Sequence, residues 1–389
     1  MAKKMLFLFV LLLSLTGMLK AQVTTAGMSG KVMADEESVI GATVVAVHEP
    51  SGTSYGTVTN VDGRFSLQGM RSGGPYKVTV SYIGYQTAIY TGIQLQLGET
   101  YSLNVTLHEA SELLGEITIT ASKSKFSAEK TGATTNISSE QLTTLPSINR
   151  SISDFTRISP YASGNSFGGR DGRSNTFTVD GANLNNNFGL SSGLPGGGNP
   201  ISLDAIDEVQ VVIAPYDVRQ ANFIGAGINA ITKSGTNAYR GSAYMYFNNE
   251  VMRGNKIGDT DFGARAEESK TVYGATFGGP IIKDKLFFFA NVEYEKSPQQ
   301  VITWRAAKEG EDPNNSTISR TTEADLAEFS QILKDKYGYN TGSFTDFPAD
   351  VTNLKLLGRI DWNINQGNKL SVRYNFCLLY TSDAADDLI

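Results

Sequence analysis

A strict alternation of apolar and polar residues in the last third of the chain constrains its fold more than any other feature. In residues 354–363 and 370–376 every second residue is apolar or glycine, namely Leu354, Leu356, Gly358, Ile360, Trp362, Leu370, Val372, Tyr374 and Phe376. A period of two places successive side chains on opposite faces of a β-strand. Ten residues at ~3.4 Å each, tilted by ~45°, project to roughly 24 Å, close to the ~25 Å apolar band of an outer-membrane barrel. Soluble sandwich strands average only ~5–6 residues, so the pattern favours membrane-spanning strands.

Segments of this kind recur after residue 237, and the lengths of their connections support a barrel. The segments are residues 239–247, 271–277, 286–295, 354–363 and 370–376. They are joined by a long, a short, a long and a short connection, and the second long one contains a predicted helix at residues 323–336. Long outer loops that alternate with tight periplasmic turns are typical of outer-membrane barrels. Residues 237–376 are therefore predicted to be the first strands of a transmembrane β-barrel.

The N-terminus has the pattern of a secretory signal peptide. Lys3 and Lys4 precede an uninterrupted apolar run at residues 5–15, after which the sequence becomes more polar. The run is shorter than the ~18 residues that a membrane-spanning helix needs. The pattern predicts a signal peptide at residues 1–21, cleavage between Ala21 and Gln22, and a mature chain outside the cytoplasm.

Residues 22–110 are predicted to form a small β-sandwich, because short strand-like runs alternate there with turn residues. These runs are residues 42–48, 64–67, 76–83 and 101–107. The motifs Gly41–Val44 and Thr59–Phe65 resemble the carboxypeptidase regulatory-like domain, which in its family is an accessory to a zinc peptidase. His48 and His108 have no His-x-x-Glu context, so the resemblance implies no peptidase activity here.

Residues 126–236 are predicted to form an α+β plug domain. Its motifs are Gly169-Arg170, then Val179-Asp180-Gly181, then a closing segment with Gly227, Asn229, Thr232 and Lys233. In this order and spacing they resemble the plug domain of TonB-dependent receptors. The candidate apical loops, residues 164–172 and 183–199, are rich in Gly and Asn. They suit either solute-binding loops or flexible turns without specificity, so the ligand-binding residues stay unknown.

A β-prone hexapeptide lies in the linker at residues 111–125. Its residues are Glu116, Ile117, Thr118, Ile119, Thr120 and Ala121. The segment resembles the TonB box of outer-membrane transporters, which pairs edge-on with the periplasmic protein TonB. In such β-augmentation, main-chain hydrogen bonds supply the affinity. The alternative is that the hexapeptide is one more strand of a nearby sheet.

The composition excludes several other function classes. The net charge is −6 and no dense basic patch is present, which argues against nucleic acid as a partner. One cysteine and two histidines leave little from which to build a zinc site, and no Ser/His/Asp ordering or phosphate loop is present. The spacing Gly225-x-Gly227-x-x-Ala230 fits a dinucleotide fingerprint but lacks its strand-turn-helix context. We expect no catalytic residues, no metal and no cofactor.

Over residues 22–376 the chain resembles TonB-dependent receptors of the Bacteroidetes type, in their Oar-like branch. The resemblance implies active import of a scarce solute across the outer membrane, with the sandwich and the TonB box in the periplasm. The implied partners are TonB with its inner-membrane energising complex, outer-membrane lipid and, as one option, a surface lipoprotein. One alternative is a surface-binding or adhesion protein whose sandwich binds carbohydrate or protein. Another, a signalling receptor, fits less well because residues 27–109 read as all-β.

The predicted strands are too few to enclose a plug. Lumens that hold a plug take ~22 strands, and an open sheet edge in lipid leaves backbone groups unsatisfied. We therefore expect this sequence to be the N-terminal part of a longer receptor. The alternation ends at Cys377-Leu378-Leu379-Tyr380, and residues 377–389 are predicted to be a non-native tail.

Overall fold

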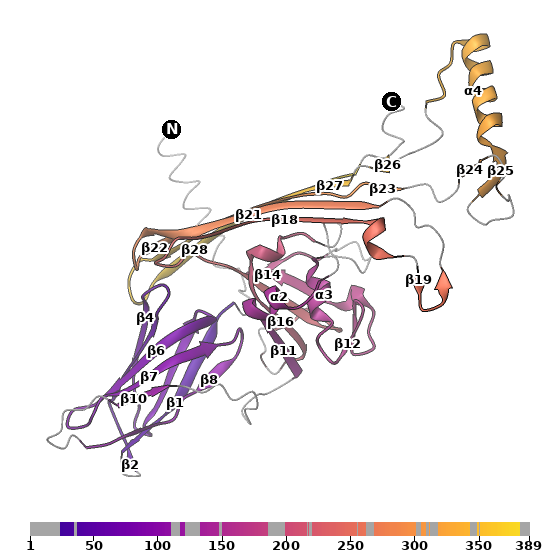
Figure 1. The fold of residues 1–389 in the computed structure, drawn as a ribbon. Helices are drawn as coiled ribbons and strands as arrows, with labels where there is room; N and C mark the ends of the chain where they lie inside the picture. Colours follow the sequence, from indigo (N-terminus) through magenta and orange to yellow (C-terminus); the bar gives the residue numbers. More distant parts are fainter. Residues whose placement is uncertain are drawn as a thin grey trace, which may run out of the picture. The chain divides into compact units, whose positions relative to one another are not determined.

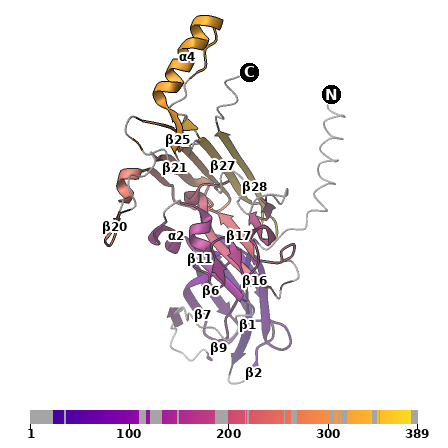
Figure 2. The same cartoon turned by 90° about the vertical axis from the view of Figure 1, so that its right-hand side faces the viewer.

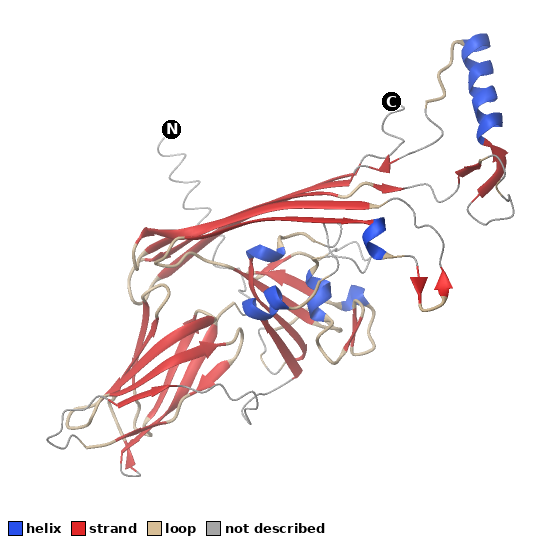
Figure 3. Ribbon diagram, in the orientation of Figure 1, coloured by secondary structure: helices blue, strands red, loops and turns tan. Residues whose placement is uncertain are grey.

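The computed structural model describes residues 24–34, 37–109, 117–120, 133–147, 150–185, 199–215, 217, 220–254, 256–261, 268–300, 305–308, 311, 318–342, 348–349 and 351–381. Strands dominate these residues (Figure 3), which confirms the mainly β class. Within the same ranges, no helix combines the length and the apolar character that crossing a membrane requires.

The chain forms two compact units, which are described separately. The first contains the described residues up to Gly241 together with Thr276–Ala290 and Leu357–Tyr374. The second contains Ser242–Ala275, Asn291–Leu356 and the residues from Asn375 onward.

The N-terminal part of the first unit is a sandwich of two sheets (Figure 1). One sheet contains β1 (Ala26–Ala34), β2 (Glu37–Ser38), β5 (Arg64–Met70), β8 (Thr100–Ser102) and β9 (Val105–Leu107). The other has the order β10-β7-β6-β3-β4, with β3 (Thr43–His48), β4 (Thr53–Val58), β6 (Gly73–Ser81), β7 (Ala88–Leu95) and β10 (Ile117–Thr120). Most pairs are antiparallel, but β1 with β8 and β9, and β10 with β7, are parallel. Met28, Tyr76 and Ile93 are among the buried residues between the sheets.

The hexapeptide of the linker is thus a strand of a nearby sheet, as the alternative interpretation had it, over residues Ile117–Thr120. Glu116 and Ala121 lie outside the described residues, as do Ala21 and Gln22 at the predicted cleavage site. Whether TonB also contacts this segment stays a prediction.

A third sheet of the first unit has the order β11-β16-β17-β14-β15. Its strands are β11 (Ala133–Ser138), β14 (Thr176–Val179), β15 (Ala182–Asn183), β16 (Ile206–Ala214) and β17 (Gly227–Thr232). The helix α2 (Ser139–Thr144) packs on β11 and β16 (Figure 2), and α3 (Ile152–Thr156) contributes Phe155 to the same core. This core also contains Phe289 and Leu357, which come from the long strands described next.

Five long strands form one sheet in chain order. They are β18 (Arg240–Asn249), β21 (Ser269–Ile282), β22 (Leu286–Lys296), β27 (Val351–Asn363) and β28 (Lys369–Thr381). Each is longer than, or shifted from, the segment predicted from side-chain alternation, because main-chain pairing continues where the alternation is imperfect. β28 in particular continues through Cys377–Tyr380, beyond the predicted strand end at Phe376.

The polarity of β27 and of the C-terminal part of β22 is the reverse of that in a soluble protein. In β27 the buried side chains include Lys355, Arg359 and Asp361, whereas Ile360 and Trp362 are 48% and 46% exposed. β22 likewise buries Asn291 and Glu293 and exposes Val292 and Tyr294. Apolar residues outside and polar residues inside are the pattern of an outer-membrane barrel wall.

The second unit contains the predicted helix, which is confirmed as α4 (Glu323–Tyr337). A capping box between Thr322 and Asp325 begins it, and Gly338 ends it in the left-handed conformation. The buried polar residues of the second unit include Lys355 of β27. Its Nζ lies 2.8 Å from Glu293 Oε1 and 3.3 Å from Glu295 Oε2.

Candidate functional site: the plug lock

The predicted Val179-Asp180-Gly181 motif forms a tight hairpin turn between β14 and β15. Val179 pairs with Ala182, so Asp180 and Gly181 are its two loop residues, with φ values of +50° and +85°. Two positive φ angles define the type I′ turn, for which Asp-Gly is a favoured sequence. The turn presents the Asp180 carboxylate at the end of the hairpin.

Asp180 joins two of the predicted plug motifs. Its Oδ1 accepts a hydrogen bond from the Thr232 backbone N–H at 3.0 Å, and its Oδ2 accepts one from the Thr232 hydroxyl at 2.6 Å. The Asp180 N–H donates to the Ala230 carbonyl at 2.8 Å. The turn is therefore fixed against the end of β17, and its carboxylate has a single orientation.

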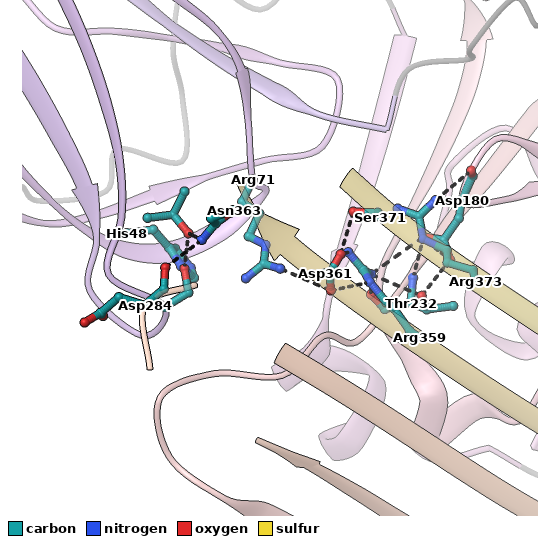
Figure 4. Close-up of polar contacts among 12 residues, drawn as sticks. His48, Arg71, Asp180, Thr232, Asp284, Arg359, Asp361, Asn363, Ser371 and Arg373 are labelled. Carbon is teal, nitrogen blue, oxygen red and sulfur yellow. Dashed lines mark hydrogen bonds and ion pairs between the residues drawn. The ribbon is translucent and has the colours of Figure 1, made fainter. Parts of the chain in front are cut away.

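Two arginines of the long strands meet this carboxylate (Figure 4). Arg373 Nε of β28 lies 3.3 Å from Asp180 Oδ2, and Arg359 Nη1 of β27 lies 3.9 Å from Oδ1. Arg373 also donates to the Asp180 carbonyl at 3.2 Å, and Arg359 donates to the Thr232 carbonyl and, at 3.2 Å, to its hydroxyl. The sheet β11-β16-β17-β14-β15, which we call the plug sheet, is thus bound to the inner face of the sheet of five long strands, which we call the strand wall.

The cluster continues from Arg359 to a second carboxylate, Asp361. Arg359 binds Asp361 through two parallel hydrogen bonds of 2.7 and 3.1 Å, and the Ser371 hydroxyl donates to Asp361 Oδ1 at 2.6 Å. Arg71 of the sandwich adds an ion pair, with its Nη2 3.2 Å from Asp361 Oδ2. We call Arg71, Asp180, Thr232, Arg359, Asp361, Ser371 and Arg373 the plug lock.

The plug lock holds charges in alternation and largely away from water. The side chains of Asp180 and Asp361 are each 6% exposed, and that of Arg359 is 9% exposed. Charge-assisted hydrogen bonds of this kind are strong and directional. Water can also replace them one by one, unlike the contacts of an apolar core. Among the described residues, no three His, Cys, Asp or Glu side chains group as a metal site would require.

The sandwich also touches the ends of the long strands. Asn363 donates to the Thr53 hydroxyl and to the Asp284 carbonyl, both at 3.0 Å. Thr53 belongs to a buried chain of hydrogen bonds that runs through Ser51 to His48 Nδ1. Burial, reinforced by the nearby Arg71 charge, lowers the pKa of His48 to about 3, so the imidazole is neutral there.

A turn of the sandwich lies against the plug sheet. The Leu97 N–H donates to both carboxylate oxygens of Glu208, at 3.1 and 3.2 Å, and the Gln210 amide donates to the Leu97 carbonyl. Leu97 is fully buried. Burial raises the pKa of Glu208 to about 7, opposed by the hydrogen bond from Leu97.

The remaining predicted plug residues lie outside the plug lock. Gly169 and Arg170 form an exposed turn after β13 (Ser166–Phe167). A side chain at Gly227 would meet the Phe223 ring at 2.7 Å. Asn229 Oδ1 accepts from the Thr178 hydroxyl at 3.0 Å, and Lys233 donates its backbone N–H to Ala205.

Sequence reasoning missed the barrel half of the plug lock. Arg359 and Asp361, and likewise Ser371 and Arg373, stand two residues apart on the polar face of an alternating strand. Charges on the face opposite the lipid were the available signal. Arg71 gave none, because it lies in a loop far from these strands in sequence.

Gly235, which closes the plug motif, is required by a close backbone approach. An alanine Cβ there would lie 2.4 Å from the Phe288 carbonyl oxygen and 2.7 Å from that of Gly279. We expect Gly235→Ala to destabilise the folded receptor by ~3 kcal/mol, because backbone atoms cannot move aside as a side chain can. The measurement is the temperature at which the compact, unboiled band is lost on a gel. Gly358→Ala, whose Cβ would meet nothing within 4 Å, is the control and should melt like the wild type.

Comparisons with known proteins agree with this architecture. Residues 27–108 match the family model of the carboxypeptidase regulatory-like domain, and residues 231–383 match that of an outer membrane beta barrel domain. The matched segments are therefore a regulatory-like domain and part of an outer-membrane β-barrel domain, and the latter locates the protein in the outer membrane. The second match includes the whole of β28.

Proteins similar to this chain include TonB-dependent transporters and siderophore receptors. The TonB-dependent transporter Oar of Myxococcus xanthus is 25% identical over 337 residues, which cover 82% of this chain and 30% of the relative. The siderophore receptor PirA of Acinetobacter baumannii aligns at 19% identity and a TM-score of 0.42, over 64% of this chain and 32% of that one. The transporter YddB of Escherichia coli aligns at 14% identity and a TM-score of 0.40, over 64% and 33%. The chain thus spans about a third of the length of these proteins.

Proposed function

We propose that this protein imports a solute across the outer membrane and that TonB drives the import by displacing the plug. The observation that carries the proposal is the plug lock, in which Asp180 of a plug motif is bound by Arg359 and Arg373 of the strand wall. The relatives named as transporters and siderophore receptors support import as the general activity.

The chemistry of the plug lock suits a gate. Each of its contacts is a hydrogen bond or an ion pair, so water can replace them when the plug moves. TonB is proposed to supply the force through residues 116–121, by strand pairing.

Deletion of Glu116–Ala121 tests the role of TonB. We expect the deletion to abolish binding of the purified periplasmic domain of TonB. It should also abolish energy-dependent accumulation of whichever labelled probe the wild type takes up from a panel of ferric siderophores, oligosaccharides and peptides. Probe binding to the cell surface should stay unchanged, because the deletion leaves the plug and the strand wall intact.

Deletion of residues 122–125 from the same linker is the matched control and should leave TonB binding in place. If the receptor without residues 116–121 still binds TonB and still accumulates the probe, the assignment of the TonB box is wrong.

A further inference from the structure

The segment proposed to contact TonB is already paired within this chain. Ile117–Thr120 form β10, which runs parallel to β7 with the register Ile117↔Ala88, Thr118↔Ile89, Ile119↔Tyr90 and Thr120↔Thr91. β10 is the terminal strand of its sheet, next to β7. The pairing is short and parallel, and parallel pairs are slightly weaker per residue than antiparallel ones. Such a strand is held, but it is held weakly enough to be exchanged.

Ile89 of β7, the register partner of Thr118, is buried on the face of β7 that points away from the sandwich core. Ala88 and Tyr90 point into the sandwich core, so Ile89, between them, belongs to the opposite face of β7. Ile89 is nevertheless only 3% exposed and is not part of that core. The outer face of β7 is therefore covered at the position that pairs with Thr118.

β7 itself is firmly anchored. Its residues Ile93 and Leu95 are buried in the sandwich core, and the turn that follows it is held by Glu208 and Gln210 of the plug sheet through Leu97. β7 can therefore keep its place when β10 leaves, and β10 can return to the same edge.

The order of the elements along the chain determines where a pull is resisted first. Residues 121–132 separate β10 from β11, the first strand of the plug sheet. While β10 is paired, tension applied to it is carried by its hydrogen bonds to β7. Tension reaches β11 only after those bonds break.

We propose that the regulatory-like domain is the resting dock of the TonB-contacting segment, and that β10 must leave β7 before TonB can pull on the plug. This inference rests on the proposed function, because it takes residues 116–121 as the contact of TonB. It gives the sandwich a task in transport: while β10 is paired with β7, force applied to the linker does not reach the plug.

The test is a reversible tether between register partners. In a Cys377→Ser background, Ile89→Cys and Thr118→Cys are combined and joined by a short thiol-cleavable crosslinker. Two matched controls share one of these changes. Ile89→Cys with Thr79→Cys staples β7 to its other neighbour, β6, and leaves β10 free. Thr118→Cys with Val58→Cys places the second thiol on β4, at the opposite edge of the sheet.

The readout is single-molecule pulling on the purified receptor through the periplasmic domain of TonB, which needs no knowledge of the solute. We expect the Ile89/Thr118 pair to crosslink in resting membranes and the Val58/Thr118 pair to crosslink at least tenfold less. Once tethered, the receptor should lose the plug-unfolding extension at forces that produce it in the wild type, and cleavage of the tether should restore it. The Ile89/Thr79 staple should pull like the wild type.

Two results would overturn the dock: failure of the Ile89/Thr118 pair to crosslink, or unchanged plug unfolding with the tether in place. If deletion of residues 116–121 stops TonB binding while the tethered receptor unfolds normally, only the dock is wrong. If the deletion leaves TonB binding intact, the proposed function itself is wrong, and the dock falls with it.

Discussion

Asp180→Asn is expected to weaken the attachment of the plug to the long strands by about 3 kcal/mol, because it removes the buried carboxylate charge that pairs with Arg373 and lies 3.9 Å from Arg359. Asparagine is the informative replacement. It tolerates the left-handed conformation that residue 180 adopts, and it preserves an oxygen for the hydrogen bond from Thr232. A weaker attachment of the plug can therefore be attributed to the lost charge rather than to backbone strain.

The measurement is the permeability of the outer membrane to vancomycin, together with protease sensitivity of the plug in the purified receptor. A plug that leaves its lock opens a path through the wall, so sensitivity to both agents should rise. Asp171→Ala is the control, since Asp171 pairs with Arg173 on the exposed surface of the same plug, with both side chains more than half exposed. If Asp180→Asn and Asp171→Ala behave alike, the plug lock does not hold the plug.

Lys355→Met is expected to cost the strand wall ~3–5 kcal/mol, the penalty for removing one partner of a buried ion pair. Lys355 is 3% exposed and is bound to Glu293 and Glu295. Without its ammonium group, the buried Glu293 retains the hydrogen bond from the Tyr244 hydroxyl at 2.7 Å but loses this cation. Methionine fills a similar volume, so packing changes little.

The melting temperature of the compact band measures this effect. Lys285→Met, on an exposed turn residue, should leave that temperature unchanged. Adding Glu293→Gln to Lys355→Met should recover part of the loss, because the buried negative charge is then removed too. Equal melting of Lys355→Met and Lys285→Met would contradict the assignment of Lys355 to a buried charge cluster.

Side-chain alternation was sufficient to predict the long strands, since a period of two has one structural meaning when it persists for ten residues. Their ends were less accurate: β28 continues to Thr381 although its alternation stops at Phe376. Main-chain hydrogen bonds extend a strand beyond the residues whose side chains reveal it. The helix predicted at residues 323–336 was found at Glu323–Tyr337.

The plug lock was only half predictable. Asp180, Gly181 and Thr232 belong to local motifs, and the Asp-Gly pair already indicates a tight turn. Arg359, Asp361 and Arg373 carry only the information that they lie on the polar face of a strand. Their partners depend on how β27 and β28 pack against the plug sheet, and side-chain periodicity does not predict that packing.

The sequence by itself determined the mainly β class, the reversed polarity of the long strands and the motifs of the plug, because each of these follows from residue order within one segment. The tertiary structure alone decided that Arg71, Asp361, Arg359 and Asp180 form one chain of charges, and that Ile117–Thr120 rest on β7. Such contacts join residues far apart in sequence, and their energy depends on distance, burial and geometry. Those quantities exist only once the chain has folded.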